Sequence, residues 1–225
     1  MSQNAIMSIA VLGGTGKEGS ALAMRWARAG YEVIIGSRSL EKAQRKVEEF
    51  NAQLGNDYLT PADNATAAAQ ADIAVLSVPY VAHKATLGQI APHVVGKILV
   101  DVTVPLDPND IFSVCLPPGR AAALEAQALL DETTCVVAAF QNVSYAKLKN
   151  LDADVDCDVL VCGDRAEAKA QVIQLVAAAG MRGIDAGPLA NAIAVEALTP
   201  VLLGINRRYK AKGAGIRITG LPETG

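Results

Sequence analysis

The sequence predicts an α/β fold built on a doubly wound, mainly parallel sheet. Short apolar segments of strand length alternate with longer helical segments from residue 8 to residue 101, an order that produces parallel strands joined by right-handed crossovers. Small aliphatic side chains dominate, and aromatic residues make up only 4% of the 225-residue chain. Such a composition suits a sheet closely covered by helices. A glycine-rich turn follows the first apolar segment.

That turn lies between the apolar run Ser8–Leu12 and a helix that includes residues 20–27. Gly14-x-Gly16-x-x-Gly19 has the spacing of a dinucleotide-binding fingerprint, in the strand-turn-helix context that the fingerprint requires. We expect Gly14 to permit the tight turn, Gly16 to let a pyrophosphate approach the backbone, and Gly19 to let the helix pack on the strand. The helix start then offers free N–H groups to the phosphates.

The remaining elements follow the same alternation. We expect strands at 31–37, 57–59, 73–78, 97–101, 135–140, 156–163 and 181–185, and helices at 40–54, 61–71, 80–90, 120–130, 165–179 and 189–210. Three prolines and no clear period between residues 106 and 119 predict a long loop. Pro200 should kink the last helix. We expect one sheet to continue past residue 140, with no independent second domain.

Composition limits the possible partners and compartment. The net charge is −3, which does not suggest a nucleic-acid-binding protein. Two His and four Cys without a CxxC motif make a metal site improbable, and we expect Cys157 and Cys162 to be buried free thiols on opposite faces of a strand. The N-terminus lacks the basic region of a signal peptide, and no apolar run reaches the roughly 20 residues of a membrane span. The sequence therefore predicts a soluble, cytoplasmic protein.

The end of the second strand distinguishes NADP from NAD. NAD sites usually carry an acidic residue about 20 residues after the glycines, where it holds the ribose 2′-hydroxyl. Here the strand ends in Gly36-Ser37-Arg38-Ser39, and the next acidic residue is Glu41. Ser37 can hydrogen-bond a 2′-phosphate, Arg38 can pair with it and lie against the adenine, and Lys42 is close behind. These residues predict NADP; the alternative is a solvated basic turn.

Two later strand ends resemble each other. Ser77-Val78-Pro79 and Thr103-Val104-Pro105 each place an extended residue before a proline. Open α/β sheets bind ligands at the carboxyl ends of their strands. We therefore expect Ser77, Val78, Pro79 and Thr103 to border the nicotinamide ribose and ring; the alternative is two ordinary proline-containing turns.

No catalytic acid–base residue is predicted. His83 and His93 are more readily explained as surface residues or as satisfied by structural partners, and Asp101 and Glu196 are as readily structural as proton-handling. Dehydrogenation of an alcohol needs a base for the hydroxyl proton. Hydride transfer between two redox cofactors needs only two rings held face to face.

Several motifs resemble those of the NADPH-dependent coenzyme F420 reductases (F420H2:NADP oxidoreductases). They are Leu12-Gly13-Gly14-Thr15-Gly16, Gly36-Ser37-Arg38, Val78-Pro79, Ala139-Phe140-Gln141-Asn142-Val143, Val161-Cys162-Gly163-Asp164, Asp185-Ala186-Gly187-Pro188-Leu189, Glu196-Ala197-Leu198-Thr199-Pro200 and Gly215-Ile216-Arg217-Ile218-Thr219-Gly220. The resemblance runs along almost the whole chain. It implies a Rossmann-like fold with a small C-terminal α/β addition, a homodimer, and hydride exchange between the nicotinamide C4 and the deazaflavin C5.

The resemblance also implies roles for individual residues. An NADP-binding Rossmann domain would span 1–140, and a small part, 141–225, would complete the pocket for the second cofactor. The pyrophosphate would be lined by Thr15, Gly16, Lys17 and Glu18, and the 2′-phosphate would be held by Ser37, Arg38 and Lys42. The nicotinamide would be bordered by Val78, Pro79 and the Thr103 loop, and the deazaflavin pocket by Gln141 and Asn191. Several family members carry His at the position of Gln141, and Gln cannot change its charge near neutral pH.

Two alternatives remain open from the residues. Gln141 is compatible with an NADPH-dependent reductase of another flat acceptor, such as a flavin or pterin. The lack of catalytic acids and bases is compatible with a non-enzymatic NADP-sensing protein, which would bind NADPH tightly without turnover.

Overall fold

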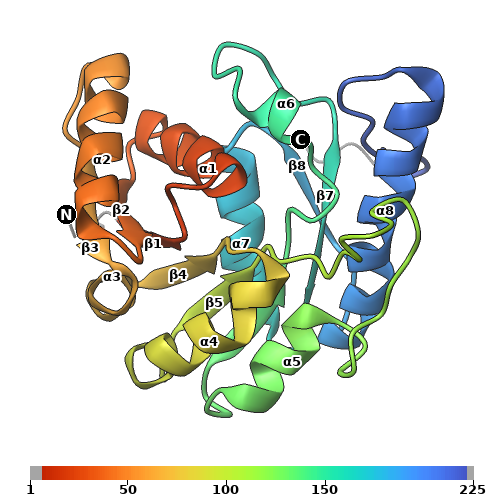
Figure 1. The fold of residues 1–225 in the computed structure, drawn as a ribbon, viewed down its shortest axis with the longest axis horizontal. Helices are drawn as coiled ribbons and strands as arrows, with labels where there is room; N and C mark the ends of the chain where they lie inside the picture. The colour runs from red at the N-terminus through yellow and green to blue at the C-terminus, as the bar shows by residue number, and fades with distance from the viewer. Residues whose placement is uncertain (1–6, 222–225) are drawn as a thin grey trace.

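The structure is a computed structural model and describes residues 7–221. Within these residues, eight strands form one sheet in the order β3-β2-β1-β4-β5-β6-β7-β8 (Figure 1). The strands are β1 (Ser8–Leu12), β2 (Glu32–Ser37), β3 (Leu59–Asp63), β4 (Ile73–Leu76), β5 (Ile98–Asp101), β6 (Cys135–Ala138), β7 (Asp158–Gly163) and β8 (Arg182–Asp185).

The sheet is mainly parallel, as the sequence predicts. Neighbouring strands from β3 through β6 pair in parallel, β7 pairs antiparallel with β6, and β8 is parallel to β7. The strand order reverses between β1 and β4, because β2 and β3 extend the sheet on one side of β1 and later strands extend it on the other. This switch point is where doubly wound sheets bind their ligands.

Helices cover both faces of the sheet (Figure 1). One core packs beneath α1 (Lys17–Arg28), α2 (Leu40–Leu54), α6 (Tyr145–Leu148) and α7 (Ala166–Ala178). The other packs beneath α3 (Asn64–Gln70), α4 (Tyr80–Ile90), α5 (Ala122–Leu129), the 3-10 turn η2 (Leu189–Asn191) and α8 (Ala192–Tyr209). A second 3-10 turn, η1 (Ala91–His93), follows α4. Along β1, Ile9 and Val11 belong to the first core and Ala10 and Leu12 to the second, the alternation of a strand buried on both faces.

The predicted position of the third strand was wrong. The observed strand, β3, spans Leu59–Asp63 and includes Pro61, which was expected to belong to the following helix. β3 pairs only with β2, and an edge strand tolerates a proline because one row of its backbone groups has no neighbour. The helix begins later, at Asn64, where the Asp63 carboxylate accepts a hydrogen bond from the Thr66 N–H at 2.9 Å.

The sheet continues past residue 140, as expected, because β7 lies beside β6. The division of function between 1–140 and 141–225 stays a prediction. The short helix α6 was not predicted, since four residues are too few to show a helical period. Cys157 and Cys162 are buried free thiols in different cores, as predicted, but only Cys162 lies on a strand, because β7 begins at Asp158.

The last helix lies within its predicted range of 189–210, but it is more apolar than expected. Residues Leu189–Tyr209 have a mean hydropathy of 1.5 and meet the length and composition of a membrane span, so the expectation that no segment does was wrong. The same helix carries the buried carboxylate of Glu196, which accepts hydrogen bonds from the Ala122 and Ala123 N–H groups at the start of α5. The charged group in the middle of this helix is therefore hydrogen-bonded within the fold.

Candidate functional site

The glycine turn forms a backbone cradle between β1 and α1. Gly14 N–H lies 3.0 Å from both the Val11 and the Gly36 carbonyl oxygens, and Gly16 N–H donates to the Gly13 carbonyl at 2.9 Å. Gly16 caps α1 without a side-chain hydrogen bond, so the helix presents its first N–H groups to an anion. Gly19 lets the helix approach closely, because a Cβ there would lie 3.1 Å from the Gly14 Cα.

The tight turn depends on a glycine that the fingerprint omits. Gly13 has a φ of +76°, the left-handed region, and a Cβ on it would lie 2.5 Å from the Ser77 carbonyl oxygen. Gly14 does not have a positive φ; a Cβ there would instead meet the Val11 carbonyl oxygen at 2.7 Å. The role predicted for Gly14 is thus shared, with Gly13 supplying the left-handed conformation.

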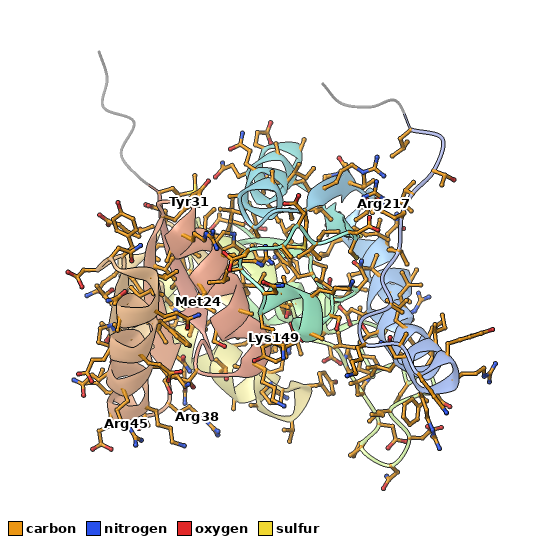
Figure 2. The ribbon with its side chains drawn as sticks, turned by 90° about the horizontal axis from the view of Figure 1, so that it is seen from above. Met24, Tyr31, Arg38, Arg45, Lys149 and Arg217 are labelled. Atoms are coloured by element: carbon orange, nitrogen blue, oxygen red, sulfur yellow. The ribbon has the colours of Figure 1, made fainter. Side chains whose placement is uncertain are left out.

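The predicted 2′-phosphate residues lie at the end of β2, beside the glycine turn. Ser37 is buried and accepts a hydrogen bond from the Ser39 N–H at 3.2 Å, while Arg38 and Lys42 are exposed. Arg45, one helical turn beyond Lys42, was missed, although the three-residue spacing places both on neighbouring parts of one helix face. Figure 2 shows Arg38 and Arg45 at the same outer corner of the molecule. This corner is suited to a phosphate.

A cavity of about 690 Å³ opens beside the glycine turn, a size typical of small-molecule sites. Its walls come from the start of α1, the ends of β4, β5 and β6, the start of α6, the middle of α8 and the chain after α8. The lining residues are Gly16, Lys17, Glu18, Ser77, Val78, Pro79, Val102, Thr103, Val104, Leu106, Phe140, Gln141, Asn142, Val143, Ser144, Tyr145, Ala146, Thr199, Leu202, Leu203, Asn206 and Ala214.

The structure thus brings most predicted site residues to one place. Gly16, Lys17, Glu18, Ser77, Val78, Pro79, Thr103 and Gln141 all line the cavity. Gly14, Thr15 and Gly19 belong to the adjoining turn, and Ser37, Arg38 and Lys42 lie beyond the cavity at the β2 end. Asn191 is not brought there: its side-chain N–H₂ donates to the Ala186 carbonyl at 2.6 Å. The part of the last helix that reaches the cavity lies at Thr199–Asn206 instead.

Two buried amide oxygens belong to side chains that line this cavity. The Gln141 side chain donates to the Asp101 backbone carbonyl at 2.8 Å, and the Asn142 side chain donates to the Asp158 backbone carbonyl at 2.6 Å. Among the described residues, Gln141 Oε1 and Asn142 Oδ1 have no hydrogen-bond partner. A buried acceptor without a partner is costly, so both oxygens fit a ligand that carries N–H or O–H donors.

A strained turn holds these two amides in place. Phe140 has a φ of +74°, which is rare for a side chain of its size, and the Val143 N–H closes the turn on the Phe140 carbonyl at 3.1 Å. The Phe140 ring packs edge-on against Trp26 of α1, with the ring centroids 5.8 Å apart. Such strain persists where the surroundings fix the backbone, and it is typical of ligand sites.

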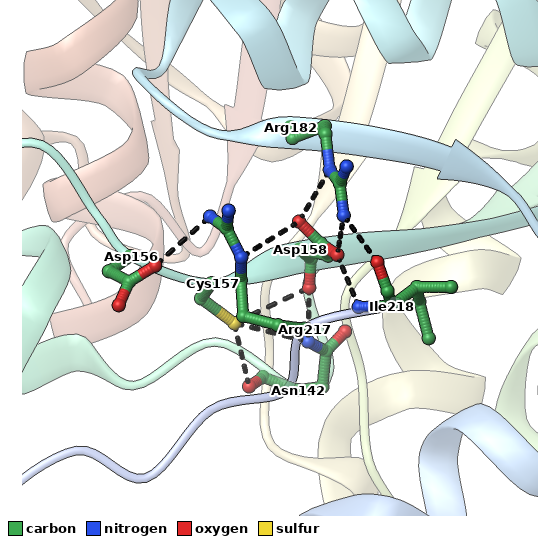
Figure 3. A network of polar contacts seen from close by, with 7 residues as sticks. All are labelled: Asn142, Asp156, Cys157, Asp158, Arg182, Arg217 and Ile218. Atoms are coloured by element: carbon green, nitrogen blue, oxygen red, sulfur yellow. Dashed lines mark hydrogen bonds and ion pairs between the residues drawn. The ribbon is translucent and has the colours of Figure 1, made fainter. Parts of the chain in front are cut away.

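The chain after α8 contributes Ala214 to the cavity lining and is held by a polar network around Asp158 (Figure 3). The Asp158 carboxylate accepts hydrogen bonds from Arg182 Nε at 2.8 Å and from the Ile218 N–H at 2.6 Å. The hydrogen bond from Arg182 lowers the pKa of Asp158 below its usual range. Because Asn142 bonds the Asp158 backbone carbonyl, this network connects the C-terminal segment to the cavity wall.

The other candidate proton-handling residues are bonded within the fold. His83 and Asp101 are buried, with His83 Nε2 2.7 Å from Asp101 Oδ2, and the Thr103 N–H donates to Asp101 Oδ1 at 2.9 Å. Burial lowers the pKa of His83, but the Asp101 hydrogen bond and the negative charges of Asp101, Glu125 and Glu196 together outweigh it and leave the pKa raised. His83 is thus satisfied by a structural partner, and neither His83 nor Asp101 lines the cavity. Burial raises the pKa of Glu196 to about 7.

A doubly wound sheet with a glycine turn at β1, a basic corner at β2 and a cavity at the switch point defines a Rossmann-type nucleotide-dependent oxidoreductase. Residues 8–105 match the model of the family described as NADP oxidoreductase, coenzyme F420-dependent. The F420-dependent NADP reductase of Methanothermobacter marburgensis is 44% identical over 225 residues, covering 96% of this chain and 100% of the relative.

Two further relatives agree. The F420-dependent NADP reductase of Methanocaldococcus jannaschii is 43% identical over 223 residues, covering 96% of this chain and 99% of the relative. A crystal structure from Arthrobacter sp. FB24, provisionally assigned as an F420-dependent NADP-reductase, superposes with a TM-score of 0.81 at 28% identity, over 95% of this chain and 100% of that one. The chain belongs to the family of coenzyme F420-dependent NADP oxidoreductases.

Proposed function

We propose that this protein transfers hydride between NADP(H) and the deazaflavin coenzyme F420. In one direction, NADPH, F420 and one proton give NADP⁺ and F420H2, with two electrons leaving the nicotinamide as hydride. The observation that carries the proposal is the cavity next to the glycine turn in a chain of this family. Three relatives are F420-dependent NADP reductases, which supports F420 as the acceptor over another flat acceptor and supports catalysis over a purely NADP-sensing role.

The residues present fit a nucleotide at this edge of the sheet. Gly14, Thr15, Gly16, Lys17 and Gly19 would hold the pyrophosphate, supported by the uncapped N–H groups of α1. Ser37, Arg38 and Lys42 would hold the 2′-phosphate. Ser77, Val78, Pro79 and Thr103 would border the nicotinamide, since they line the cavity nearest the switch point.

The C-terminal part would complete the site for the second ring. Residues 140–146 also line the cavity, together with Thr199, Leu202, Leu203 and Asn206 of α8, and this part of the lining carries the acceptor oxygens of Gln141 and Asn142. When both cofactors are bound, the nicotinamide supplies hydride chemistry and the deazaflavin receives it. The protein's own contribution is to align two flat rings and exclude water, which lowers the entropic part of the barrier.

Loss of F420 absorbance tests the reaction. Purified protein with NADPH should bleach the oxidised deazaflavin band, whereas flavin and pterin acceptors at equal concentration should react far more slowly. If NADPH binds normally and F420 stays oxidised, the proposed reaction is wrong.

Arg38→Ala should weaken the binding of NADPH far more than the binding of NADH. Arg38 is exposed at the basic corner, and its charge-assisted hydrogen bond to the 2′-phosphate is worth about 1.5–3 kcal/mol, so we expect NADPH affinity to fall roughly 10- to 100-fold. Arg165→Ala, an exposed arginine before α7, removes the same charge elsewhere. Calorimetric titration with both nucleotides gives the ratio; equal losses for NADPH and NADH would show that Arg38 does not contact the phosphate.

We further propose a cytoplasmic homodimer. The outer face of α8 exposes Val201 and Ile205, and the adjoining loop exposes Leu116 beside Ala197 and Pro200. Exposed apolar side chains grouped in this way are typical of subunit interfaces. These residues form the candidate surface for a second copy.

Val201→Glu should convert the dimer to a monomer, because it places a charge in an apolar contact that offers it no partner. Val95→Glu, at an equally exposed valine away from α8, should leave the dimer intact. Sedimentation velocity distinguishes the two species. A wild-type protein that sediments as a monomer at micromolar concentration would contradict the dimer.

A further inference from the structure

Glu18 is the one carboxylate among the residues lining the cavity. It is the second residue of α1, and its Oε1 accepts a hydrogen bond from the Tyr145 N–H at 3.2 Å. This bond joins the first helix to the start of α6, and the β4 and β5 ends line the same cavity. The half-buried carboxylate is therefore tethered to α6 at the cavity lining.

We infer that Glu18 discriminates between the two redox states of the nucleotide, favouring NADP⁺ over NADPH. The nicotinamide ring is cationic when oxidised and neutral when reduced, whereas the phosphates are the same in both. A carboxylate in the cavity that holds the ring attracts only the oxidised form. The inference rests on the nucleotide placement proposed above, and it assigns Glu18 to the ring rather than to the pyrophosphate that the family resemblance implied, because Glu18 lines the same cavity as Ser77 and Thr103.

The surroundings make this charge effective. Burial raises the pKa of Glu18 to about 7, against the opposing hydrogen bond from Tyr145, so the carboxyl changes charge near neutral pH. The other charged groups of α1 are Lys17 at its start and Arg25 and Arg28 in its last turn. On the α6 side they are Lys147 and the capping residue Lys149, which lies over the Tyr145 ring, 6.0 Å from its centroid. In the described part of the chain, none of these lysines forms an ion pair with Glu18.

The direction of the effect follows from linkage. A bound cationic ring stabilises the ionised carboxyl, so NADP⁺ lowers the pKa of Glu18, and ionised Glu18 tightens NADP⁺ to the same extent. Two unit charges several ångströms apart in a partly buried site change affinity by about tenfold. A tenfold preference lowers the potential of the bound nucleotide couple by about 30 mV, which favours hydride leaving NADPH.

The ratio of dissociation constants, Kd(NADP⁺)/Kd(NADPH), measures this preference directly. Isothermal titration from pH 6 to pH 8.5 should show the ratio falling about tenfold in the wild type as Glu18 ionises. Titration of the nucleotide 2′-phosphate, with a pKa of about 6, affects both nucleotides alike and cancels. In Glu18→Gln, which keeps an acceptor for Tyr145, the ratio should stay high and independent of pH.

Glu167→Gln is the matched control, since Glu167 is an exposed acid in the first turn of α7, outside the cavity; it should behave as the wild type. A ratio that Glu18→Gln leaves unchanged overturns the inference, as does a failure of both nucleotides to bind. These titrations contain no F420. A shift of the ratio in a protein that cannot reduce F420 would support the inference and refute only the proposed reaction.

Discussion

Gly13→Ala is expected to raise the Kd for NADPH by about 100-fold in a protein that still folds. The new Cβ would lie 2.5 Å from the Ser77 carbonyl oxygen and 2.7 Å from Val78 Cγ1. Since the first obstacle is backbone, the glycine turn and the β4 end must move apart. Losing hydrogen bonds from the turn to the charged pyrophosphate, at about 1.5–3 kcal/mol each, costs on the order of 100-fold in affinity. Left-handed strain and overpacking together should also destabilise the protein by about 2–5 kcal/mol.

Gly96→Ala separates the two causes. Gly96 has a nearly identical φ of +72°, but a Cβ there has nothing within 4 Å. It should cost only the left-handed strain of about 1–2 kcal/mol and leave NADPH affinity unchanged. Urea unfolding and calorimetric titration on both variants measure stability and binding separately. Equal effects of the two substitutions would mean that the contact with the β4 end is unimportant.

Local signals explain how well the sequence predicted the elements. Leu40–Leu54 and Tyr80–Ile90 match their predicted bounds. The first of these has Ser39 accepting from the Lys42 N–H at its start and Gly55 in the left-handed conformation at its end, both signals that sequence displays. β3 was misplaced because an edge strand half exposed to solvent lacks a continuous apolar run.

The site was predictable where it depends on topology. Parallel strands place their carboxyl ends at one edge, so the glycine turn, Ser77–Pro79 and Thr103 were expected to meet, and they do. Contacts between distant segments carry no local signal. The Tyr145 N–H bond to Glu18 spans 127 residues. That α8 reaches the cavity at Thr199–Asn206 and not near Asn191 depends on how the helix lies across the sheet. The role of Gly13 required its φ, which sequence alone does not give.

The two parts of the chain are joined most strongly by one buried arginine. Arg25 of α1 is 7% exposed and donates to five backbone carbonyls of the C-terminal part. Nε bonds the Leu148 carbonyl at 2.8 Å, Nη1 the Ala179 carbonyl at 2.9 Å, and Nη2 the carbonyls of Asn150 at 2.6 Å, Ala153 at 3.1 Å and Lys147 at 3.5 Å. The guanidinium thus satisfies the carbonyl groups at the end of α6, in the loop after it and at the end of α7.

Arg25→Met should therefore lower the free energy of unfolding by about 3–5 kcal/mol, because it leaves a cluster of buried carbonyls without donors. Arg28→Met, one turn on and exposed, removes only a surface ion pair with Asp152 and should cost about 0–1 kcal/mol. Both substitutions remove a cation from the last turn of α1, so the helix dipole contributes equally. Equal urea midpoints would refute the structural role of Arg25. Because Tyr145 and Ala146 of α6 line the cavity, hydrogen exchange in Arg25→Met should increase first at residues 145–153, ahead of the central strands.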